Sequence, residues 1–355
     1  MKSLVYGSGS YFDQKKSVIK GEIIGFVDSY KTGEYDGRTF YLPKQISEIE
    51  YDFIYVMARE NAFCEMVYML LANSVCREKI IIGQNLKPYI WGEELFISEE
   101  KLFFIDENNK LNYKFYDISM AFSTYDEFYG IRDVFCNRDY DFGICGEKTI
   151  VCDIGMNVGA AALYFASRND VIKVCAYEPF EPTYRTALYN IQKNPMLSDK
   201  IESQNVGMGA YDEEREIVYN PSMTCGLSTN KEISGVAKEQ YKLFGLYREE
   251  AERTMIVSLV DAAEEMTKII RDNVGMNLLV KLDCEGSEYE IMQRWQEKGL
   301  FKHINMIMLE WHYKGESFVR DILEKNGFYL FSFAKGISMG TIYAINGQIE
   351  KGKGK

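Results

Sequence analysis

Histidine is scarce in this sequence, and the cysteines lack the spacing of a metal site. The 355 residues include two histidines, His303 and His312, and eight cysteines without a C-x-x-C pair. A structural zinc site needs several such ligands at short, regular spacings, so we predict no structural zinc. Three cysteines, Cys152, Cys175 and Cys284, lie in apolar, strand-like runs, where a free thiol behaves as a small hydrophobic residue. We expect reduced, buried thiols.

Long apolar runs and concentrated positive charge are also missing. No run of about 18 apolar residues, the minimum for a membrane-spanning helix, occurs. Glycines interrupt the first stretch, MKSLVYGSGSYF, before the core of a signal peptide could form, so we predict neither membrane insertion nor secretion, and a cytoplasmic location. The formal net charge is -12, whereas nucleic acids and anionic membranes attract clusters of Lys and Arg. We therefore predict no nucleic-acid partner and no membrane partner.

The chain is long enough for two domains, and its first part alternates between strand and helix patterns. With 46% hydrophobic and 26% charged residues, it can bury more than one core. Residues 1–88 contain the strand patterns SLVYGSGS, EIIGFVDS, YDFIYVMA and EKIIIG and the helix pattern NAFCEMVYMLLANS. Because this alternation is typical of a parallel sheet, we predict a small Rossmann-like α/β module there.

A segment of different composition follows, and then the alternation starts again. Residues 89–145 are rich in aromatic and charged residues, and Asn108 and Asn109 in KLFFIDENNKLNYKFYD are typical of a hairpin turn between two strands. Residues 146–347 alternate strand and helix patterns and end with two adjacent strand patterns, FYLFSF and GTIYAING. We predict a connecting segment with a hairpin, a second α/β domain closed by an antiparallel pair, and a disordered tail at 348–355.

A glycine-rich turn in TIVCDIGMNVGAAALYFA joins the first strand of the second domain to its helix. A dinucleotide-binding turn has the spacing G-x-G-x-x-G and holds a pyrophosphate at the helix N-terminus. Here the turn contains Asp153, Gly155, Asn157 and Gly159, and the carboxylate of Asp153 would repel a pyrophosphate. A ligand with an ammonium group beside a carboxylate suits this turn, because Asp153 attracts the first and the turn amides and helix dipole attract the second. S-adenosylmethionine carries both groups.

An acidic residue at the end of the next strand supports the same ligand. Glu178 lies in CAYEPF, where a carboxylate can accept hydrogen bonds from both ribose hydroxyls of a dinucleotide or of S-adenosylmethionine. Together with the preceding turn, this position predicts S-adenosylmethionine as the cofactor.

Four segments in this order resemble the signatures of the FkbM-type S-adenosylmethionine-dependent methyltransferases: VCDIGMNVG, AYEPFEPTYRTALYNIQKN, VKLDCEGSEYEIM and IMLEWH. The resemblance covers residues 140–345 and implies a class I methyltransferase fold, a Rossmann-like α/β sheet with a terminal antiparallel strand pair. It implies cofactor-binding roles for Asp153, Gly155, Asn157, Gly159, Glu178, Asn205 and Gly207. Two features depart from the family: Met156 replaces the usual alanine, and the segment 220–253 is longer, which we expect to alter the acceptor side.

The later signatures bring acidic residues and a histidine to one edge of the predicted sheet. The strand period of two puts Lys281 and Asp283 on one face, with Glu285 just beyond the strand. Ligands of open α/β sheets bind at this edge, the carboxyl ends of the strands. Methyl transfer to a hydroxyl group requires an aligned acceptor and a group that removes its proton. We predict a catalytic site formed by Asp283, Glu285, Glu310 and His312.

Several interpretations stay open at this edge. His312 suits a general base because imidazole titrates near neutral pH, but Asp283 or Glu285 could act as the base or bind a divalent metal ion instead. Lys281 and Asp283 could form only a buried ion pair, and we take Glu288 for a solvated helix residue. The amphipathic stretch VAKEQYKLFGLYREEAERT is either a surface helix or helix pair, or a lid over the acceptor.

The leading prediction is an O-methyltransferase that acts on a hydroxyl group of a sugar or glycan-type small molecule, the acceptor class that the resemblance implies. The alternative is a non-catalytic protein that binds a nucleotide or S-adenosylmethionine. A nicotinamide oxidoreductase is disfavoured, because Gly7 and Gly9 in VYGSGSYF fit the dinucleotide pattern but Phe12 occupies its third glycine position. We expect a degenerate first module with a structural or oligomerising role, so a homo-oligomer stays open.

Overall fold

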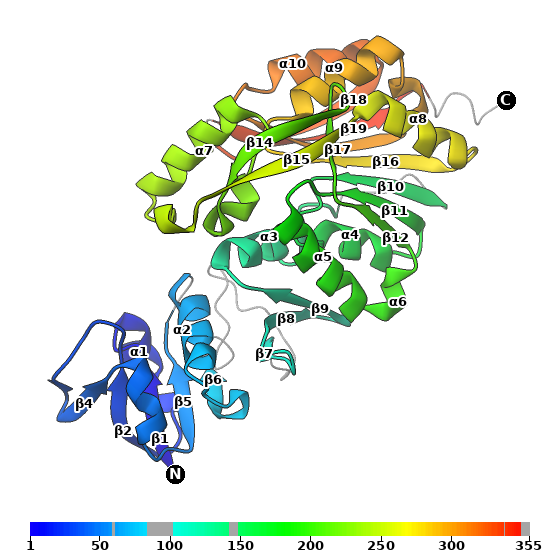
Figure 1. The fold of residues 1–355 in the computed structure, drawn as a ribbon. Coiled ribbons are helices and arrows are strands. Elements are labelled where there is room, and N and C mark those ends of the chain that lie inside the picture. The colour runs from blue at the N-terminus through cyan, green and yellow to red at the C-terminus, as the bar shows by residue number, and fades with distance from the viewer. Residues whose placement is uncertain (59–60, 84–101, 142–147, 337, 349–355) are drawn as a thin grey trace. The chain divides into compact units, whose positions relative to one another are not determined.

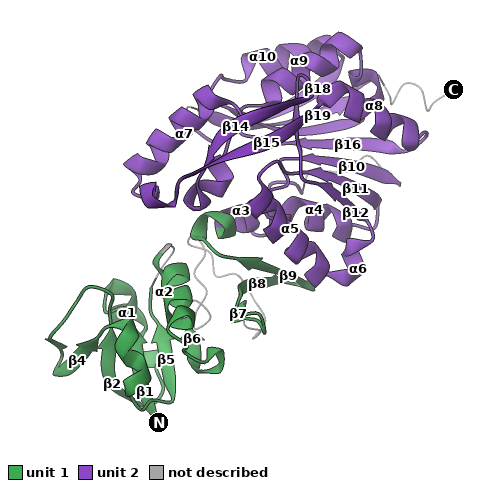
Figure 2. Ribbon diagram, viewed as in Figure 1, with its two compact units in different colours: residues 1–128 green, residues 129–355 purple. Residues whose placement is uncertain are grey.

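The structure, a computed structural model, describes residues 1–58, 61–83, 102–141, 148–336 and 338–348. The chain forms two compact units, residues 1–128 and residues 129–355 (Figure 2). The predicted segments 1–88, 89–145 and 146–347 divide the chain differently, and as domains they stay a prediction. Most of the predicted tail, residues 349–355, lies outside the described residues. Within the described ranges, no helix is long and apolar enough to cross a membrane.

The first unit contains a six-stranded sheet in the order β3-β4-β2-β1-β5-β6 (Figure 1). Its elements are β1 (Lys2–Tyr6), α1 (Ser10–Lys15), β2 (Glu22–Val27), β3 (Glu34–Tyr35), β4 (Arg38–Tyr41), β5 (Phe53–Val56), α2 (Asn61–Ala72) and β6 (Ile80–Ile82). β1 pairs in parallel with both β2 and β5, as the strand and helix alternation predicts. Phe12 of α1 is buried against Phe26, with ring centroids 5.3 Å apart. An apolar contact therefore fills the position where a dinucleotide fold has its third glycine.

A three-stranded antiparallel sheet lies between residues 103 and 122. It consists of β7 (Phe103–Ile105), β8 (Leu111–Phe115) and β9 (Ile118–Phe122), followed by α3 (Tyr125–Phe135). The predicted hairpin is confirmed: β7 and β8 pair antiparallel, and Asn109 adopts a left-handed φ of 57° in the turn. The carboxylate of Asp106 accepts hydrogen bonds from the N–H groups of Asn108 and Lys110, which fixes the turn. The third strand and the helix were not predicted.

Seven strands form the main sheet of the second unit, in the order β12-β11-β10-β16-β17-β19-β18. They are β10 (Thr149–Ile154), β11 (Val171–Tyr177), β12 (Ile201–Gln204), β16 (Asn277–Leu282), β17 (Met306–His312), β18 (Phe328–Ala334) and β19 (Met339–Asn346). The first five strands in this order pair in parallel, and β19 pairs antiparallel with both β17 and β18. The predicted class I Rossmann-like sheet with a terminal antiparallel pair is therefore confirmed.

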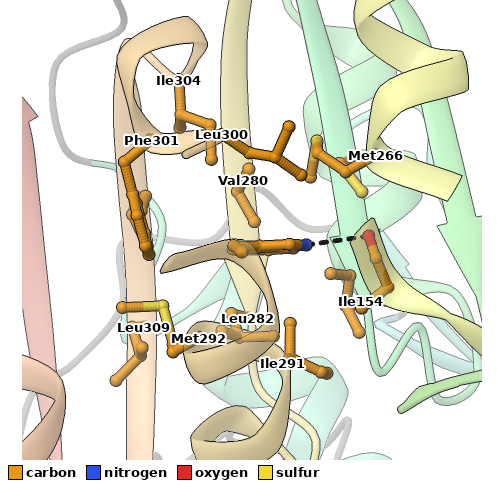
Figure 3. Close-up of a cluster of buried hydrophobic side chains, with 14 of the residues drawn as sticks. Ile154, Met266, Val280, Leu282, Ile291, Met292, Leu300, Phe301, Ile304 and Leu309 are labelled. Carbon is orange, nitrogen blue, oxygen red and sulfur yellow. Dashed lines mark hydrogen bonds between the residues drawn. The ribbon is translucent and has the colours of Figure 1, made fainter. Parts of the chain in front are cut away.

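Helices cover both faces of this sheet (Figure 1). One face carries α4 (Ala160–Ser167), α5 (Glu181–Lys193) and α6 (Pro195–Ser198), and the other carries α8 (Ala262–Asp272), α9 (Glu288–Lys298) and α10 (Ser317–Lys325). Trp295 of α9 is fully buried, and its Nε1–H donates to the carbonyl oxygen of Ala262 over 2.8 Å. Val280 and Leu309 from the strands and Met292 of α9 belong to the same buried cluster (Figure 3). This packing holds α9 against the strands β16 and β17.

A second, three-stranded sheet in this unit was not predicted. It has the order β13-β15-β14 and consists of β13 (Gly207–Gly209), β14 (Glu213–Tyr219) and β15 (Arg253–Asp261), with α7 (Lys231–Leu243) between the last two. The stretch 236–254, predicted as a helix or helix pair, is only partly helical. The α-helix ends at Leu243, Gly245 follows with a left-handed φ of 68°, and the chain enters β15 at Arg253. Apolar residues alternate along β14 and β15, and the helical pattern of their neighbours obscured this signal.

Candidate active site

The glycine turn follows β10 and packs against the loop after β16. Gly155 and Gly159 have φ values of 82° and 89°, which side chains disfavour, and Asn157 adopts 51°. A Cβ atom on Gly155 would lie 1.8 Å from the backbone oxygen of Asp283. Glycine is therefore required at position 155 because the backbone of the neighbouring loop passes directly over it. The glycine turn therefore packs directly against the loop that contains Asp283 and Glu285, called the acidic loop below.

Glu178 follows β11 and faces this turn. It is 4% exposed, and its two carboxylate oxygens accept hydrogen bonds from the backbone N–H groups of Asn157 (2.9 Å) and Phe180 (3.0 Å). Burial raises the pKa of this carboxyl to about 7. The hydrogen bonds from the two N–H groups favour the charged form and oppose part of this rise. Each oxygen retains a second lone pair. Glu178 thus holds the turn in place and can still accept a hydrogen bond from a ligand.

Lys281 lies at the end of β16 and contacts both the glycine turn and the acidic loop. Its Nζ lies 3.2 Å from Asp153 Oδ1 and 3.6 Å from Asp283 Oδ2, and it donates to the carbonyl oxygen of Gly155 over 2.5 Å. Burial by itself would lower the pKa of Lys281, but the carboxylates of Asp153 and Asp283 raise it. For Asp153, burial raises the pKa and Lys281 opposes this shift. The predicted Lys281–Asp283 ion pair is present, and Asp153 belongs to the same buried group.

Asn205 and Gly207 lie beside Glu178 but in different elements. Asn205 directly follows β12, and its Nδ2 donates to the carbonyl oxygens of Glu178 and Pro179. Gly207 begins β13, where a Cβ atom would lie 2.6 Å from a methyl group of Leu259. Asn205 therefore shapes the loop that carries Glu178, whereas Gly207 allows β13 to pack closely on β15.

The four predicted catalytic residues lie together at the carboxyl ends of β16 and β17. The Nε2 atom of His312 is 3.4 Å from Glu285 Oε1, 3.8 Å from Glu310 Oε1 and 3.9 Å from Asp283 Oδ1. His312 is 1% exposed, and its Nε2 has no hydrogen-bond partner in the part of the chain that the structure describes. The carboxyl ends of adjacent parallel strands thus bring three carboxylates around one imidazole nitrogen.

Glu288 is a further member of this site, and its prediction as a solvated residue is wrong. It is fully buried at the start of α9. Its Oε1 accepts a hydrogen bond from the backbone N–H of His312 (2.8 Å) and lies 3.2 Å from His312 Nδ1, while its Oε2 accepts from the N–H of Gly286 (2.6 Å). An Nδ1–H that donates to Glu288 leaves the lone pair of His312 on Nε2, which faces the other carboxylates. Helical periodicity alone does not predict the burial of Glu288, because the loop before α9 turns this side chain inward.

Burial and mutual charge shift the protonation equilibria of this cluster. Burial raises the pKa of Glu285 well above its usual range, with the neighbouring carboxylates adding to the effect and His312 opposing it. Burial by itself would lower the pKa of His312, but Glu285 and Glu288 raise it well above its usual value. Burial would also raise the pKa of Asp283, but Lys281 and His312 hold it below its usual value. The cluster therefore has a strong affinity for positive charge, as a proton or as another cation.

Residues 220–243 contact both the glycine turn and the acidic loop. This segment comprises the 3₁₀ helix η5 (Pro221–Gly226) and α7. The Nδ2 of Asn157 lies within 3.5 Å of the carbonyl oxygen of Thr224. A Cβ atom on Gly286 would lie 2.0 Å from a methyl group of Ile233, and Tyr313 Oη donates to Gln240 over 3.2 Å. The inserted segment thus lies against the candidate site.

Three residues other than glycine adopt left-handed backbone conformations in this region. They are Asn157 (φ 51°), Glu285 (φ 53°) and Tyr313 (φ 63°), one after each of β10, β16 and β17. Such conformations cost roughly 1–3 kcal/mol each and concentrate at functional sites, where the surrounding structure holds them. Their position at one edge of the sheet supports an active site there.

Comparisons with known proteins find a matching family model for each part of the chain and several similar proteins. The model of the Methyltransferase FkbM domain matches residues 153–330, and the model of the C2185-like N-terminal domain matches residues 1–81. Methyltransferase 1 of Beauveria bassiana is 22% identical over 205 residues, which are 56% of this chain and 79% of that protein. AMB antimetabolite synthetase AmbE of Pseudomonas aeruginosa is 24% identical over 226 residues, which are 56% of this chain but only 10% of AmbE. The crystal structure of Methyltransferase FkbM from Methylobacillus flagellatus is 11% identical, covers 97% of this chain and 89% of that one, and has a TM-score of 0.37.

Proposed function

The chain belongs to the FkbM methyltransferase family, and from this premise we propose that it is an S-adenosylmethionine-dependent O-methyltransferase. Its acceptor is a hydroxyl group of a sugar or glycan-type small molecule. One observation carries the proposal: the glycine turn packs directly against the loop of Asp283 and Glu285. A cofactor at the turn therefore lies next to groups that can take a proton from an acceptor.

The residues around the turn fit the polar groups of S-adenosylmethionine. The Oδ2 atom of Asp153 has no hydrogen-bond partner among the residues described, so it can attract the ammonium group, directly or through a water molecule. The first N–H groups of α4 favour the carboxylate of the ligand. The remaining lone pairs of Glu178 suit the ribose hydroxyls. Asn205 supports this site by fixing the loop of Glu178.

The acidic cluster provides the proton acceptor that O-methylation requires. When bound, S-adenosylmethionine supplies an activated methyl group: its S–CH₃ bond breaks as the acceptor oxygen forms the new O–CH₃ bond and loses its proton. Glu288 orients His312 through Nδ1, so that Nε2 faces Asp283, Glu285 and Glu310. This cluster receives the hydroxyl proton. A positioned group of this kind accelerates proton transfer by roughly 10²–10⁴-fold.

Segment 220–243 acts as the cover of the acceptor site. Its residues Thr224 and Ile233 lie against the turn and the acidic loop, respectively. A cover excludes water from the transfer reaction and contacts the acceptor. Residues 220–253, which include this segment, are longer than is usual in the family, and this supports an acceptor specific to this protein.

Two measurements on the full chain test the proposal. Calorimetric titration with S-adenosylmethionine and S-adenosylhomocysteine should give saturable binding with one site per chain. Incubation with S-adenosylmethionine and a panel of nucleotide sugars and oligosaccharides should give an acceptor that gains one methyl group by mass spectrometry. The absence of cofactor binding at millimolar ligand contradicts the cofactor assignment. A methylated product that carries the new group on nitrogen or on a carboxylate contradicts the acceptor class.

A further inference from the structure

His312 Nε2 is a buried polar atom without a hydrogen-bond partner in the described parts of the chain, and three carboxylate oxygens surround it. Their distances from Nε2 are 3.4, 3.8 and 3.9 Å. Two ligand atoms that are each about 2.1 Å from one metal ion lie roughly 3.0 to 4.2 Å apart, depending on the angle between them. All three distances fall within this interval. The ligand atoms offered by Asp283, Glu285 and His312 lie within 4.8 Å of one another, which is an upper limit for the distance between the two carboxylates.

In three of the four residues, Asp283, Glu310 and His312, the second polar atom of the side chain has a partner of its own. The Oδ2 of Asp283 accepts a hydrogen bond from Tyr140 Oη over 3.1 Å. The Oε2 of Glu310 accepts from Lys335 Nζ over 2.9 Å. The Nδ1 of His312 lies 3.2 Å from Glu288 Oε1. Outer partners of this kind orient the ligands of a metal ion, and here they leave one atom of each of these three residues facing the centre of the cluster.

We propose that Asp283, Glu285, Glu310 and His312 bind one divalent cation of the Mn²⁺ or Zn²⁺ type. One imidazole with carboxylate oxygens suits these ions better than Mg²⁺, which prefers oxygen ligands alone and keeps several waters. Three carboxylates carry one negative charge more than a divalent ion neutralises, and Lys335 and Lys281 add positive charge on the outer side of Glu310 and Asp283. The fit of donor types, spacing and outer partners thus points to a metal ion rather than to a plain ion-pair network.

The position of this site gives the cation a role that rests on the proposed function. The backbone N–H of Asp283 donates to the carbonyl oxygen of Ile154, at the start of the glycine turn. An acceptor hydroxyl bound to the cation therefore lies beside the cofactor turn, and a bound cation makes a hydroxyl easier to deprotonate. The hydroxyl O–H bond breaks, and its proton passes to a carboxylate of the cluster or to solvent. Cation binding itself does not depend on methyl transfer.

Mn²⁺ titration of the full-length chain, freed of metal with EDTA, tests the site. Calorimetry and the decrease of the free Mn²⁺ signal in electron paramagnetic resonance should both give one saturable site per chain. His312→Ala and Glu285→Gln should weaken Mn²⁺ binding at least about tenfold, since even outer partners of metal sites contribute roughly 10–100-fold. Glu202→Gln is a matched control, because Glu202 is an exposed carboxylate paired with Lys173. Its Mn²⁺ affinity should equal that of the unmodified chain.

Two further variants keep the test decisive if His312→Ala does not fold. Glu310→Gln changes a proposed ligand, and Glu288→Gln changes the carboxylate that orients His312 and also accepts from the N–H of Gly286. Both should weaken Mn²⁺ binding with an unchanged circular dichroism spectrum. The inference is overturned if the folded, unmodified chain binds neither Mn²⁺ nor Zn²⁺ at millimolar concentration, or if all folded cluster variants bind Mn²⁺ normally. Titration of the metal-free chain with S-adenosylmethionine separates the two proposals. Cofactor binding without Mn²⁺ binding refutes the metal site alone, and Mn²⁺ binding without cofactor binding refutes the proposed function alone.

Discussion

Two glycine turns, one at Gly7 in the first unit and one at Gly155 in the second, have similar local geometry and different surroundings. Gly7 follows β1 with a φ of 101°, and a Cβ atom there would lie 2.5 Å from the backbone oxygen of Met57, just after β5. Gly155 follows β10 with a φ of 82°, and its Cβ would lie 1.8 Å from the backbone oxygen of Asp283, just after β16. In both units, the turn after the central strand packs against the end of a neighbouring strand.

The side chains around the two turns differ in chemistry. Around Gly7, the core contains Phe12 and Met57, and Asp28 uses its carboxylate to accept the N–H groups of Tyr30 and Lys31 in its own loop. Around Gly155, the structure buries Asp153, Lys281, Glu178, Glu288 and His312. Some of their polar atoms, such as His312 Nε2, have no hydrogen-bond partner within the residues described. A glycine turn therefore indicates the fold, whereas buried polar atoms that the fold leaves unsatisfied indicate the site.

The largest difference between the two turns should appear in the rate of methyl transfer. We expect His312→Ala or Asp283→Asn to lower the single-turnover rate by roughly 10²–10⁴-fold, because the substitution removes a group that takes the proton of the acceptor hydroxyl. Cofactor affinity, measured by calorimetry, should change little. Asp28→Asn changes the acidic residue that follows β2 in the first unit, as Glu178 follows β11 in the second, and it should leave the rate unchanged. Equal rate losses in Asp28→Asn and Asp283→Asn would remove the distinction between the turns.

Alanine substitutions at Gly7 and Gly155 test the two turns through the free energy of unfolding. Gly155→Ala and Gly7→Ala both place a Cβ against a backbone oxygen at positive φ. Each should destabilise its own unit by roughly 2–5 kcal/mol, from about 1–3 for overpacking and about 1–2 for the left-handed conformation. Urea unfolding measures the free energy of unfolding of each variant. Calorimetric titration of the folded variants with S-adenosylmethionine measures their cofactor affinity. Only Gly155→Ala should lose cofactor binding; a loss in Gly7→Ala would show that the first turn contributes to the cofactor site.

Ligand-induced stabilisation should also separate the units. S-adenosylmethionine at a hundredfold excess over Kd should stabilise the full chain by about 2.7 kcal/mol and raise its Tm. NAD should produce no shift, because Phe12 is buried at the position where a dinucleotide turn needs glycine. Thermal melts with millimolar ligand provide the measurement. A low-micromolar Kd for NAD would contradict this expectation and assign a nucleotide site to the first unit.

The smallest effect we expect is a pH dependence of cofactor binding through Glu178. Its pKa of about 7 lies above the ordinary 4.5, so the folded chain binds an additional proton between these values, and this stabilising contribution is lost as pH rises through about 7. The ribose hydroxyls need the charged carboxylate as acceptor, so S-adenosylmethionine affinity should rise about tenfold from pH 6 to pH 8. Glu178→Gln should remove this slope while it keeps one acceptor oxygen for the turn. A slope of the same size in Glu178→Gln would assign it to another group.

Several features of the fold and site were predictable because they depend on local pattern. Strand and helix alternation predicted the parallel sheets, and the two asparagines at 108 and 109 predicted the hairpin. The grouping of Asp283, Glu285, Glu310 and His312 was also predictable, since the carboxyl ends of adjacent parallel strands meet at one edge. By contrast, β14 and β15 were missed, because they form a separate small sheet around an inserted helix.

The amino-acid sequence by itself determined the order of elements, the two glycine turns and the identity of the residues at the strand ends. Each of these depends on neighbouring residues along the chain: hydrophobic period, the conformational freedom of glycine and the position of a residue relative to a strand end. Only the tertiary structure decided that Glu288 turns inward, that His312 Nε2 faces three carboxylates, and that residues 220–243 lie against them. The burial and orientation of a polar side chain depend on which distant segments pack around it, and this packing belongs to the whole fold rather than to any short stretch of sequence.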